Sequence, residues 1–165
     1  MDPSHSGSPS PKASPATRPT LFIAHTKELI RSGLVAMASD HGMRVTGCVA
    51  DTDAAVEGIV RTRPAVALVD CLLAGAGGFD AARRVAADAP QVRVILMSVN
   101  SDANHLARAH AAGAVNCIAK GLPVEEVARA IEVAASIEPP ASVAAHAAIG
   151  RGGRGGASVL TGGRT

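Results

Sequence analysis

Residues 65–69 form an apolar run, AVALV, which is followed at once by the carboxylate of Asp70. The run is apolar at every position, whereas a strand with one face in water alternates between apolar and polar residues. Such a strand is buried on both faces, which indicates a parallel sheet covered by helices on each side. A glycine-rich loop, AGAGG, follows at residues 74–78. The chain therefore ends a deeply buried strand on one acidic side chain.

Four further apolar segments have the length of strands, at residues 20–24, 44–50, 92–98 and 115–119. The segments between them carry the spacing of amphipathic helices. In the last one, the side chains that share one face are Val124, Val127, Ile131 and Ala134. Pro123 suits the first turn of this helix. The strand–helix alternation predicts an α/β fold with a doubly wound, five-stranded parallel sheet and right-handed crossovers.

Residues at three helix ends support the same boundaries. Asp51 is suited to cap the second helix, and Ser101 or Asp102 the fourth. Gly113 lies where the fourth helix would end. These residues predict where the helices begin and end.

Composition narrows the class of protein. The 165 residues are 47% hydrophobic but include only two aromatic residues, Phe22 and Phe79, so aliphatic side chains must build the core. A net charge of +2 does not argue for nucleic acid or a membrane surface, and no apolar run approaches the roughly 18 residues of a membrane span. Three widely spaced cysteines, Cys48, Cys71 and Cys117, are expected to be reduced thiols of a cytoplasmic protein.

The ends of the chain differ in composition from its middle. Residues 1–19 are rich in Pro and Ser and lack the apolar core of a secretory signal, so we expect a disordered lead-in. Pro139-Pro140 and the motif GRGGRGG predict a flexible tail over residues 138–165. One domain is expected at residues 20–137.

In doubly wound sheets, ligands bind at the carboxyl ends of the strands, so functional residues are expected there. The polar residues that follow the expected strands are His25, Thr26, Asp70, Ser98 and Lys120. Asp70, Ser98 and Lys120 end the third, fourth and fifth strands in that order.

The segments RPAVALVD, VRVILMS and AAGAVNCIAKG, with Gly75 and Gly78, resemble the receiver domains of two-component response regulators over residues 21–136. Residues 30–64 are similar to the subgroup that carries a LuxR-type helix-turn-helix. The resemblance implies a flavodoxin-like (CheY-like) fold with strand order 2-1-3-4-5. It also implies that Asp70 accepts a phosphoryl group from a histidine kinase, while Lys120 and Ser98 contact the phosphoryl oxygens.

The sequence departs from the family where an acidic pair normally helps to bind Mg²⁺. His25 and Thr26 occupy those two positions. The usual three carboxylates and one lysine carry a formal charge of −2, whereas Asp70 and Lys120 sum to zero. Mg²⁺ prefers oxygen ligands, so at most weak binding and impaired phosphotransfer are expected. Ala74 and Cys117 stand where relatives often have a proline and an aromatic switch residue.

Two interpretations of Asp70 stay open: a phosphoacceptor, or an acid ion-paired with Lys120 in an inert pocket. His25 is expected to be a capping or solvated loop residue rather than a metal ligand. Cys71 is expected to pack inward, with a redox switch as the alternative. The glycine-rich loop lacks a nucleotide-binding motif, and RGGRGG lacks the interleaved aromatic residues that stack bases. No triad, acid–base pair or metal cluster argues for an enzyme.

Two functions follow. The first is a phosphorelay receiver with a histidine kinase as partner, which signals or dimerises through the fourth helix, fifth strand and fifth helix, near His105, Arg108 and Asn116. The alternative is a phosphorylation-independent pseudo-receiver that acts as a protein-binding or dimerisation module. The last residues, SVLTGGRT, resemble the opening of a LuxR-type DNA-binding domain. DNA binding by this chain alone is not expected.

Overall fold

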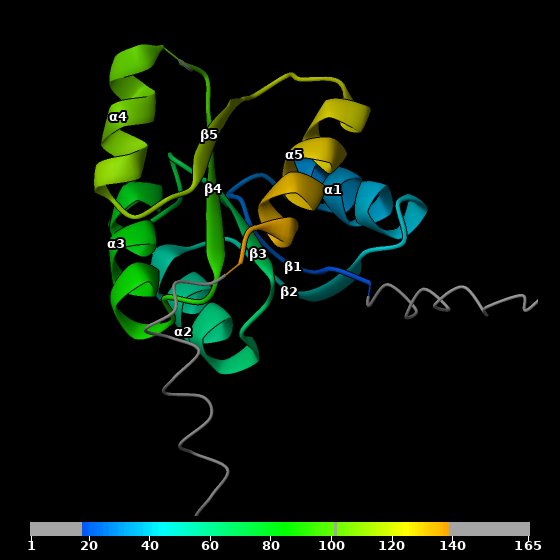
Figure 1. Ribbon diagram of the computed structural model, residues 1–165, viewed down its shortest axis with the longest axis horizontal. Coiled ribbons are helices and arrows are strands. Elements are labelled where there is room, and N and C mark those ends of the chain that lie inside the picture. Colours follow the sequence, from blue (N-terminus) through cyan, green and yellow to red (C-terminus); the bar gives the residue numbers. More distant parts are fainter. Residues whose placement is uncertain (1–17, 101, 139–165) are drawn as a thin grey trace, which may run out of the picture.

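Five parallel strands form one sheet in the order β2-β1-β3-β4-β5 in a computed structural model, which describes residues 18–100 and 102–138 (Figure 1). The strands are β1 (Thr20–Ala24), β2 (Arg44–Val49), β3 (Val66–Asp70), β4 (Arg93–Ser98) and β5 (Asn116–Ala119). The helices are α1 (Glu28–Asp40), α2 (Thr52–Thr62), α3 (Gly78–Asp88), α4 (Ala103–Ala111) and α5 (Val124–Ser136). The doubly wound fold and the strand order predicted from the sequence are confirmed.

Two layers of helices cover the sheet, as the fully apolar third strand requires. Helices α2, α3 and α4 pack with one set of strand side chains, and α1 and α5 pack with the other (Figure 1). Every residue of β3 and β4 is buried. The two central strands therefore bring their ends to a site that is already enclosed by protein.

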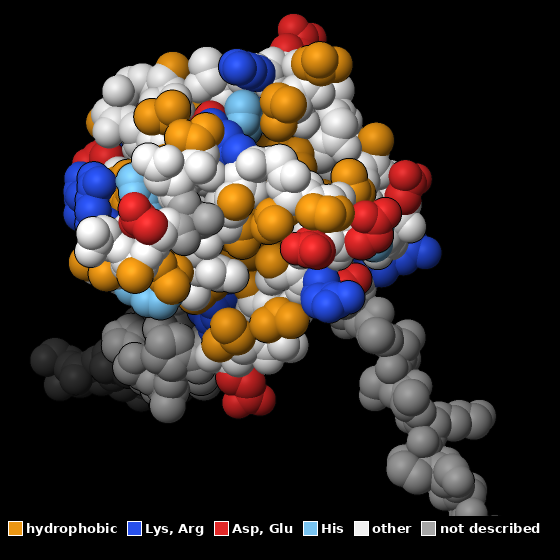
Figure 2. Space-filling model, turned by 90° about the horizontal axis from the view of Figure 1, so that it is seen from above, with side chains coloured by type: hydrophobic (Ala, Val, Ile, Leu, Met, Phe, Trp, Pro, Cys, Tyr) orange, Lys and Arg blue, Asp and Glu red, His pale blue; other side chains and the backbone are white. Residues whose placement is uncertain are grey.

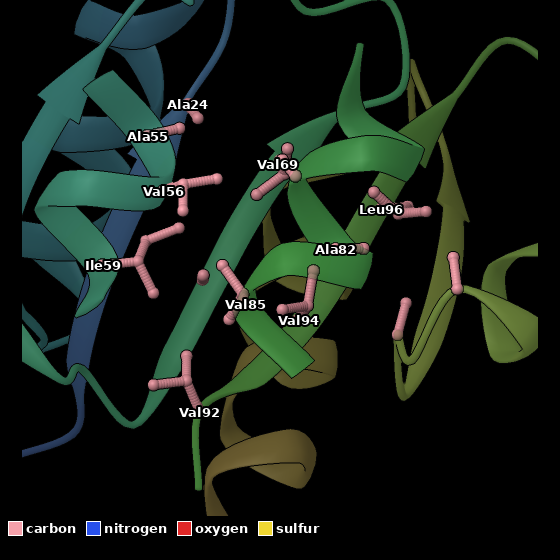
Figure 3. Packing of buried hydrophobic residues seen from close by; sticks show 14 of the residues in the cluster. Ala24, Ala55, Val56, Ile59, Val69, Ala82, Val85, Val92, Val94 and Leu96 are labelled. Atoms are coloured by element: carbon pink, nitrogen blue, oxygen red, sulfur yellow. The ribbon is translucent and has the colours of Figure 1, made fainter. Parts of the chain in front are cut away.

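Two glycines make room for Phe22, the more deeply buried of the two aromatic side chains. Phe22 is buried on the face that α2 covers, and a Cβ atom at Gly47 or Gly58 would lie 2.2 or 2.5 Å from its ring. The rest of this layer is aliphatic, with Val56 and Ile59 of α2 beside the sheet (Figure 3). An aliphatic core with one buried ring is what the composition predicts.

The expected boundaries hold to within one residue, the usual spread of such assignments. The Asp51 and Asp102 side chains cap α2 and α4, while Ser101, the other candidate, lies outside the described residues. Gly113 follows α4 with a φ of +90°. Pro123 is the N-cap of α5 rather than a residue of its first turn.

Three of the four side chains predicted to share one face of α5 are buried. These are Val127, Ile131 and Ala134, whereas Val124, the first residue of the helix, is half exposed. The lead-in and the tail, residues 1–17 and 139–165, lie outside the described residues, and so does the similarity of SVLTGGRT to a DNA-binding domain. Within the described part of the chain, no helix is long and apolar enough to cross a membrane.

Candidate functional site at the carboxyl ends of the strands

Lys120 and His25 meet the carboxylate of Asp70 from two other strand ends. Asp70 is the last residue of β3, His25 directly follows β1, and Lys120 directly follows β5. Strand β1 lies beside β3, and the Lys120 backbone N–H donates to the carbonyl of Ser98 at the end of β4. The sheet order therefore gathers residues from distant parts of the sequence at one edge.

Donors surround the Asp70 carboxylate, and its side chain is only 3% exposed. Lys120 Nζ lies 2.5 Å from Oδ1, which also accepts a hydrogen bond from the backbone N–H of Leu72 at 3.0 Å. His25 Nε2 lies 3.3 Å from Oδ2. A buried carboxylate is tolerated when it is paired and hydrogen-bonded, and here both of its oxygens have partners.

Of the two expectations for His25, a capping residue or a solvated loop residue, the second is wrong. It is buried, and its Nδ1 accepts a hydrogen bond from the backbone N–H of Lys27 at 3.0 Å. A neutral imidazole that accepts at one nitrogen carries its hydrogen on the other, so the nitrogen that lies 3.3 Å from Asp70 Oδ2 is the protonated Nε2. Burial lowers the pKa of His25, against the opposing effect of the Asp70 charge, and this favours the neutral ring.

Strand order explains why the sequence reasoning missed this contact. His25 continues β1, the direct neighbour of β3, so its side chain reaches the same end of the sheet as Asp70. A histidine at the end of a strand is common enough in sequences that its position alone did not distinguish it from a capping residue.

Thr26, at the second acidic-pair position, joins two loops. Its hydroxyl donates to the carbonyl of Leu72 at 3.2 Å. Arg31 Nη1 donates to the carbonyls of His25 and Thr26 at 2.7 and 2.9 Å, which fixes the start of α1 to the same loop. These bonds hold the segment after β1 against the segment after β3.

Ser98 lies at the neighbouring strand end, but its hydroxyl bonds elsewhere. It is buried, accepts from the backbone N–H of Asn100 at 3.2 Å and interacts with the Cys71 thiol. Asp70 is in register with Met97, so Ser98 lies one residue farther along. Of the two predicted phosphoryl-contacting residues, Lys120 touches Asp70 in the described structure, and Ser98 borders the same edge.

Two cysteines pack beneath this edge, as expected for Cys71. Burial raises the pKa of the Cys71 thiol to about 12, and burial also raises the pKa of Cys117. Cys48 instead faces solvent on β2. Protonated, buried thiols react slowly, so the redox alternative for Cys71 gains no support here.

The loop after Asp70 is held close to the strand end by a threonine and by glycines. The Thr52 hydroxyl donates to the Ala74 carbonyl at 2.9 Å and accepts from the Gly77 N–H at 3.0 Å. Gly77 has a φ of +88°, and a Cβ atom at Gly78 would lie 2.2 Å from the Asp70 carbonyl oxygen. Only glycine permits this approach at residue 78.

The residues present do not fit Mg²⁺. The ion requires oxygen ligands in near-octahedral geometry, with one or two carboxylates as its usual protein ligands. Here the single carboxylate already has Lys120 and His25 beside its two oxygens and accepts a hydrogen bond from the Leu72 N–H. Among the described residues, no three His, Cys, Asp or Glu side chains are grouped so that they could hold a metal.

Charged side chains are scattered over the surface around the carboxyl ends of the strands. Figure 2 looks down on the side that is uppermost in Figure 1, and it shows positive, negative and histidine side chains scattered among hydrophobic ones. On that face there is no broad patch of one sign. This distribution does not suit the phosphate backbone of a nucleic acid.

A family model describing the response regulator receiver domain matches residues 21–132. This chain belongs to the response regulator receiver domain family. The fold, the strand order and the position of Asp70 at the end of β3 agree with that membership.

Named relatives support the assignment. The chain is 30% identical over 112 residues to the response regulator UvrY of Escherichia coli, covering 67% of this chain and 51% of UvrY. It is 27% identical over 112 residues to the response regulator GacA of Pseudomonas aeruginosa, covering 67% of this chain and 52% of GacA. The chain thus spans about half the length of the curated relatives that it matches.

A solved structure gives the same result. The signal receiver domain of the response regulator NarL from Mycobacterium tuberculosis has a TM-score of 0.68 and 27% identity, covering 72% of this chain and 96% of that domain. As a receiver domain, the chain is a module of two-component signalling, in which receivers interact with histidine kinases.

Proposed function

We propose that this chain is a receiver in which Asp70 is the phosphoacceptor and magnesium-supported phosphotransfer is impaired. The observation that carries the proposal is the position of His25, whose Nε2 lies 3.3 Å from Asp70 Oδ2 where the family places a metal-binding acid. The pocket sums to a formal charge of zero, from Asp70 and Lys120 with a neutral His25. Such a pocket attracts a divalent cation less than one with a charge of −2.

The transfer would proceed from a phosphohistidine of a kinase. An Asp70 oxygen forms a bond to phosphorus while the bond from phosphorus to the histidine nitrogen breaks, and the departing imidazole takes up a proton. Lys120 supplies a positive charge to the phosphoryl oxygens, and the Ser98 hydroxyl is available at the adjacent strand end.

The surroundings of the pocket suit a protein partner. Leu72 and Val99, which follow β3 and β4, are exposed by 69% and 68%. Exposed hydrophobic side chains beside a polar site are typical of protein-binding surfaces. They support docking of a kinase or another signalling protein at this edge.

Acetyl phosphate tests the proposal, with phosphorylation measured by intact mass in the presence and absence of Mg²⁺. The variant that restores the acidic pair, His25→Asp with Thr26→Asp, should gain one phosphoryl group in a magnesium-dependent manner. The unaltered chain should gain little under the same conditions. Asp70→Asn placed in the restored chain is the matched control and should abolish the gain.

Two outcomes would contradict the proposal. Magnesium-dependent labelling of the unaltered chain at the rate of the restored variant would disprove the impairment. Labelling that survives Asp70→Asn would disprove the assignment of the phosphoacceptor.

A phosphorylation-independent pseudo-receiver is the second candidate, and the contacts that both Asp70 oxygens already make with Lys120, His25 and Leu72 favour it. In that case the chain would associate with a partner, or with a second copy of itself, in the same way whatever the state of Asp70. Light scattering with Asp70→Asn separates the two functions: an unchanged mass supports the pseudo-receiver, and a shift in oligomeric state argues against it.

His105 and Arg108, which are expected near the face proposed for self-association, both contact α3. His105 and Arg108 of α4 face Phe79 of α3, with ring centroids 6.0 Å apart for the first pair and Arg108 Cζ 4.7 Å from the ring centroid in the second. Asn116 lies at the start of β5, where its side chain accepts from the N–H of Cys117. Dimerisation through α4, β5 and α5 stays a proposal.

A further inference from the structure

A hollow lies between α3 and α4, on the layer that covers one face of the sheet. Its volume is about 230 Å³, and the residues that line it are Phe79, Arg83, Arg108, Ala111 and Ala112. The two alanines leave space because their side chains end at Cβ. None of the residues of the Asp70 pocket lines this hollow.

The positive charge in the hollow is incompletely neutralised. Arg108 forms no ion pair with any residue that the structure describes, and its guanidinium stacks over the Phe79 ring. Arg83 pairs with Asp80 at 3.1 Å, but the same carboxylate lies 3.8 Å from Arg84. Arg84 also pairs with Asp53 at 2.7 Å, so each of these α3 arginines has an acid, whereas Arg108 has none among the residues that the structure describes.

The stacking prepares Arg108 to bind a planar anion. A guanidinium lying on an aromatic ring keeps its N–H groups in its own plane, where they match the two oxygens of a carboxylate. The attraction between the cation and the ring limits the motion of a long side chain, which reduces the entropy lost on binding. Phe79 and the two alanines provide an apolar wall beside these donors.

We propose that this hollow binds a small aromatic carboxylate, held by Arg108 and Arg83 with its ring against Phe79 and the alanines. The volume lies below the roughly 300–1,000 Å³ of pockets for drug-sized ligands, so a single ring with one acidic group is the size that fits. The apolar wall favours an aromatic acid over inorganic phosphate, which would leave that wall uncovered. The site is independent of phosphorylation at Asp70.

A titration of the isotopically labelled chain with benzoate, followed by amide NMR shifts, tests this site. Saturable shifts should appear at Phe79, Ala111 and Ala112. Benzamide, which has the same shape without the charge, should bind at least about ten-fold more weakly, because charge-assisted hydrogen bonds are the stronger ones.

Arg108→Gln should weaken benzoate binding about ten-fold. The matched control is Arg129→Gln, an exposed arginine of α5 in the other helical layer, which should change nothing. Shifts that never saturate, equal binding of benzamide, or unchanged binding by the Arg108 variant would each overturn the site. Failure here leaves the acetyl phosphate experiment unaffected, because that reaction is measured at Asp70.

Discussion

Asp70 and Arg93 are buried charged residues on the neighbouring strands β3 and β4. Asp70 lies at the carboxyl end of its strand and Arg93 at the amino end of its own, and their surroundings differ. Asp70 ends β3 and meets an ammonium, an imidazole N–H and a backbone N–H. Arg93 begins β4 and donates only to carbonyl oxygens: Nη1 to Gln91 at 2.9 Å and Nη2 to Ile137 at 3.0 Å. Its Nε has no hydrogen-bond partner in the described structure.

The difference separates a reactive site from an anchor. Two of the three Asp70 partners are side chains, the Lys120 ammonium and the His25 imidazole, so a reactant that brings its own charge can replace them. The Arg93 partners are neutral backbone groups, and one of them is the residue that follows α5. Arg93 therefore connects the end of α5 to the amino end of β4, and we expect its role to be structural.

Removing the cation from the Asp70 pocket should have the largest effect. Lys120→Met leaves a buried carboxylate without its counter-charge, and we expect a loss of about 3 kcal/mol in the free energy of unfolding, measured with urea at pH 7. Adding Asp70→Asn to Lys120→Met should recover part of that loss, because the uncompensated charge is gone.

Lys27→Met, at the exposed start of α1, is the control for this pair and should change stability little. A loss as small for Lys120→Met as for Lys27→Met would mean that His25 and Leu72 alone satisfy the carboxylate. The proposed difference between Asp70, which needs a counter-charge, and Arg93, which needs only carbonyl acceptors, would then be wrong.

Arg93→Met should cost less, about 2 kcal/mol, because it removes hydrogen bonds to carbonyls and leaves no charge behind. Hydrogen exchange should rise at the last turn of α5, where the Ile137 carbonyl loses its donor. Arg44→Met, at the exposed start of β2, is the comparison. Exchange that rises equally across the whole domain would indicate a general loss of stability and would argue against a local anchor.

Acidification should give the smallest effect, and it comes from His25. Its pKa is lowered in the folded chain, so below about pH 6.5 the unfolded chain binds a proton that the folded chain does not. The stabilisation is complete above that pH and is lost as the pH falls toward the lowered pKa. Urea unfolding between pH 7 and pH 5 should show a shallower decline in His25→Gln than in the unaltered chain; equal slopes would refute this assignment.

Much of the fold follows from local pattern. The apolar run before Asp70 required two covering layers, and the strand–helix alternation placed the boundaries to within a residue. Asp51 and Asp102 were predictable as caps because a cap acts within its own turn. The exposed start of α5 was less predictable, since periodicity shows which side chains share a face but not where the neighbouring layer ends.

The site was predictable only in part. Order along the chain and the family resemblance pointed to Asp70, Ser98 and Lys120 as strand ends, and the Lys120 contact with Asp70 is present. The sequence did not predict the contact of His25 with Asp70, nor the hydrogen bonds from the Arg93 guanidinium to backbone carbonyls. His25 lies 45 residues from Asp70 along the chain, and Arg93 lies 44 residues from Ile137. Local sequence pattern does not reach partners at such separations.

The sequence by itself determined that a parallel sheet would form and that an aspartate would follow its most buried strand. Apolar periodicity and helix capping decide this because both act over a few neighbouring residues. The folded molecule decided which groups neutralise that aspartate, which hydrogen the imidazole keeps and where two arginines face a phenylalanine across a hollow. These outcomes depend on distances of a few ångströms between side chains of different elements, and only the packing of those elements sets such distances.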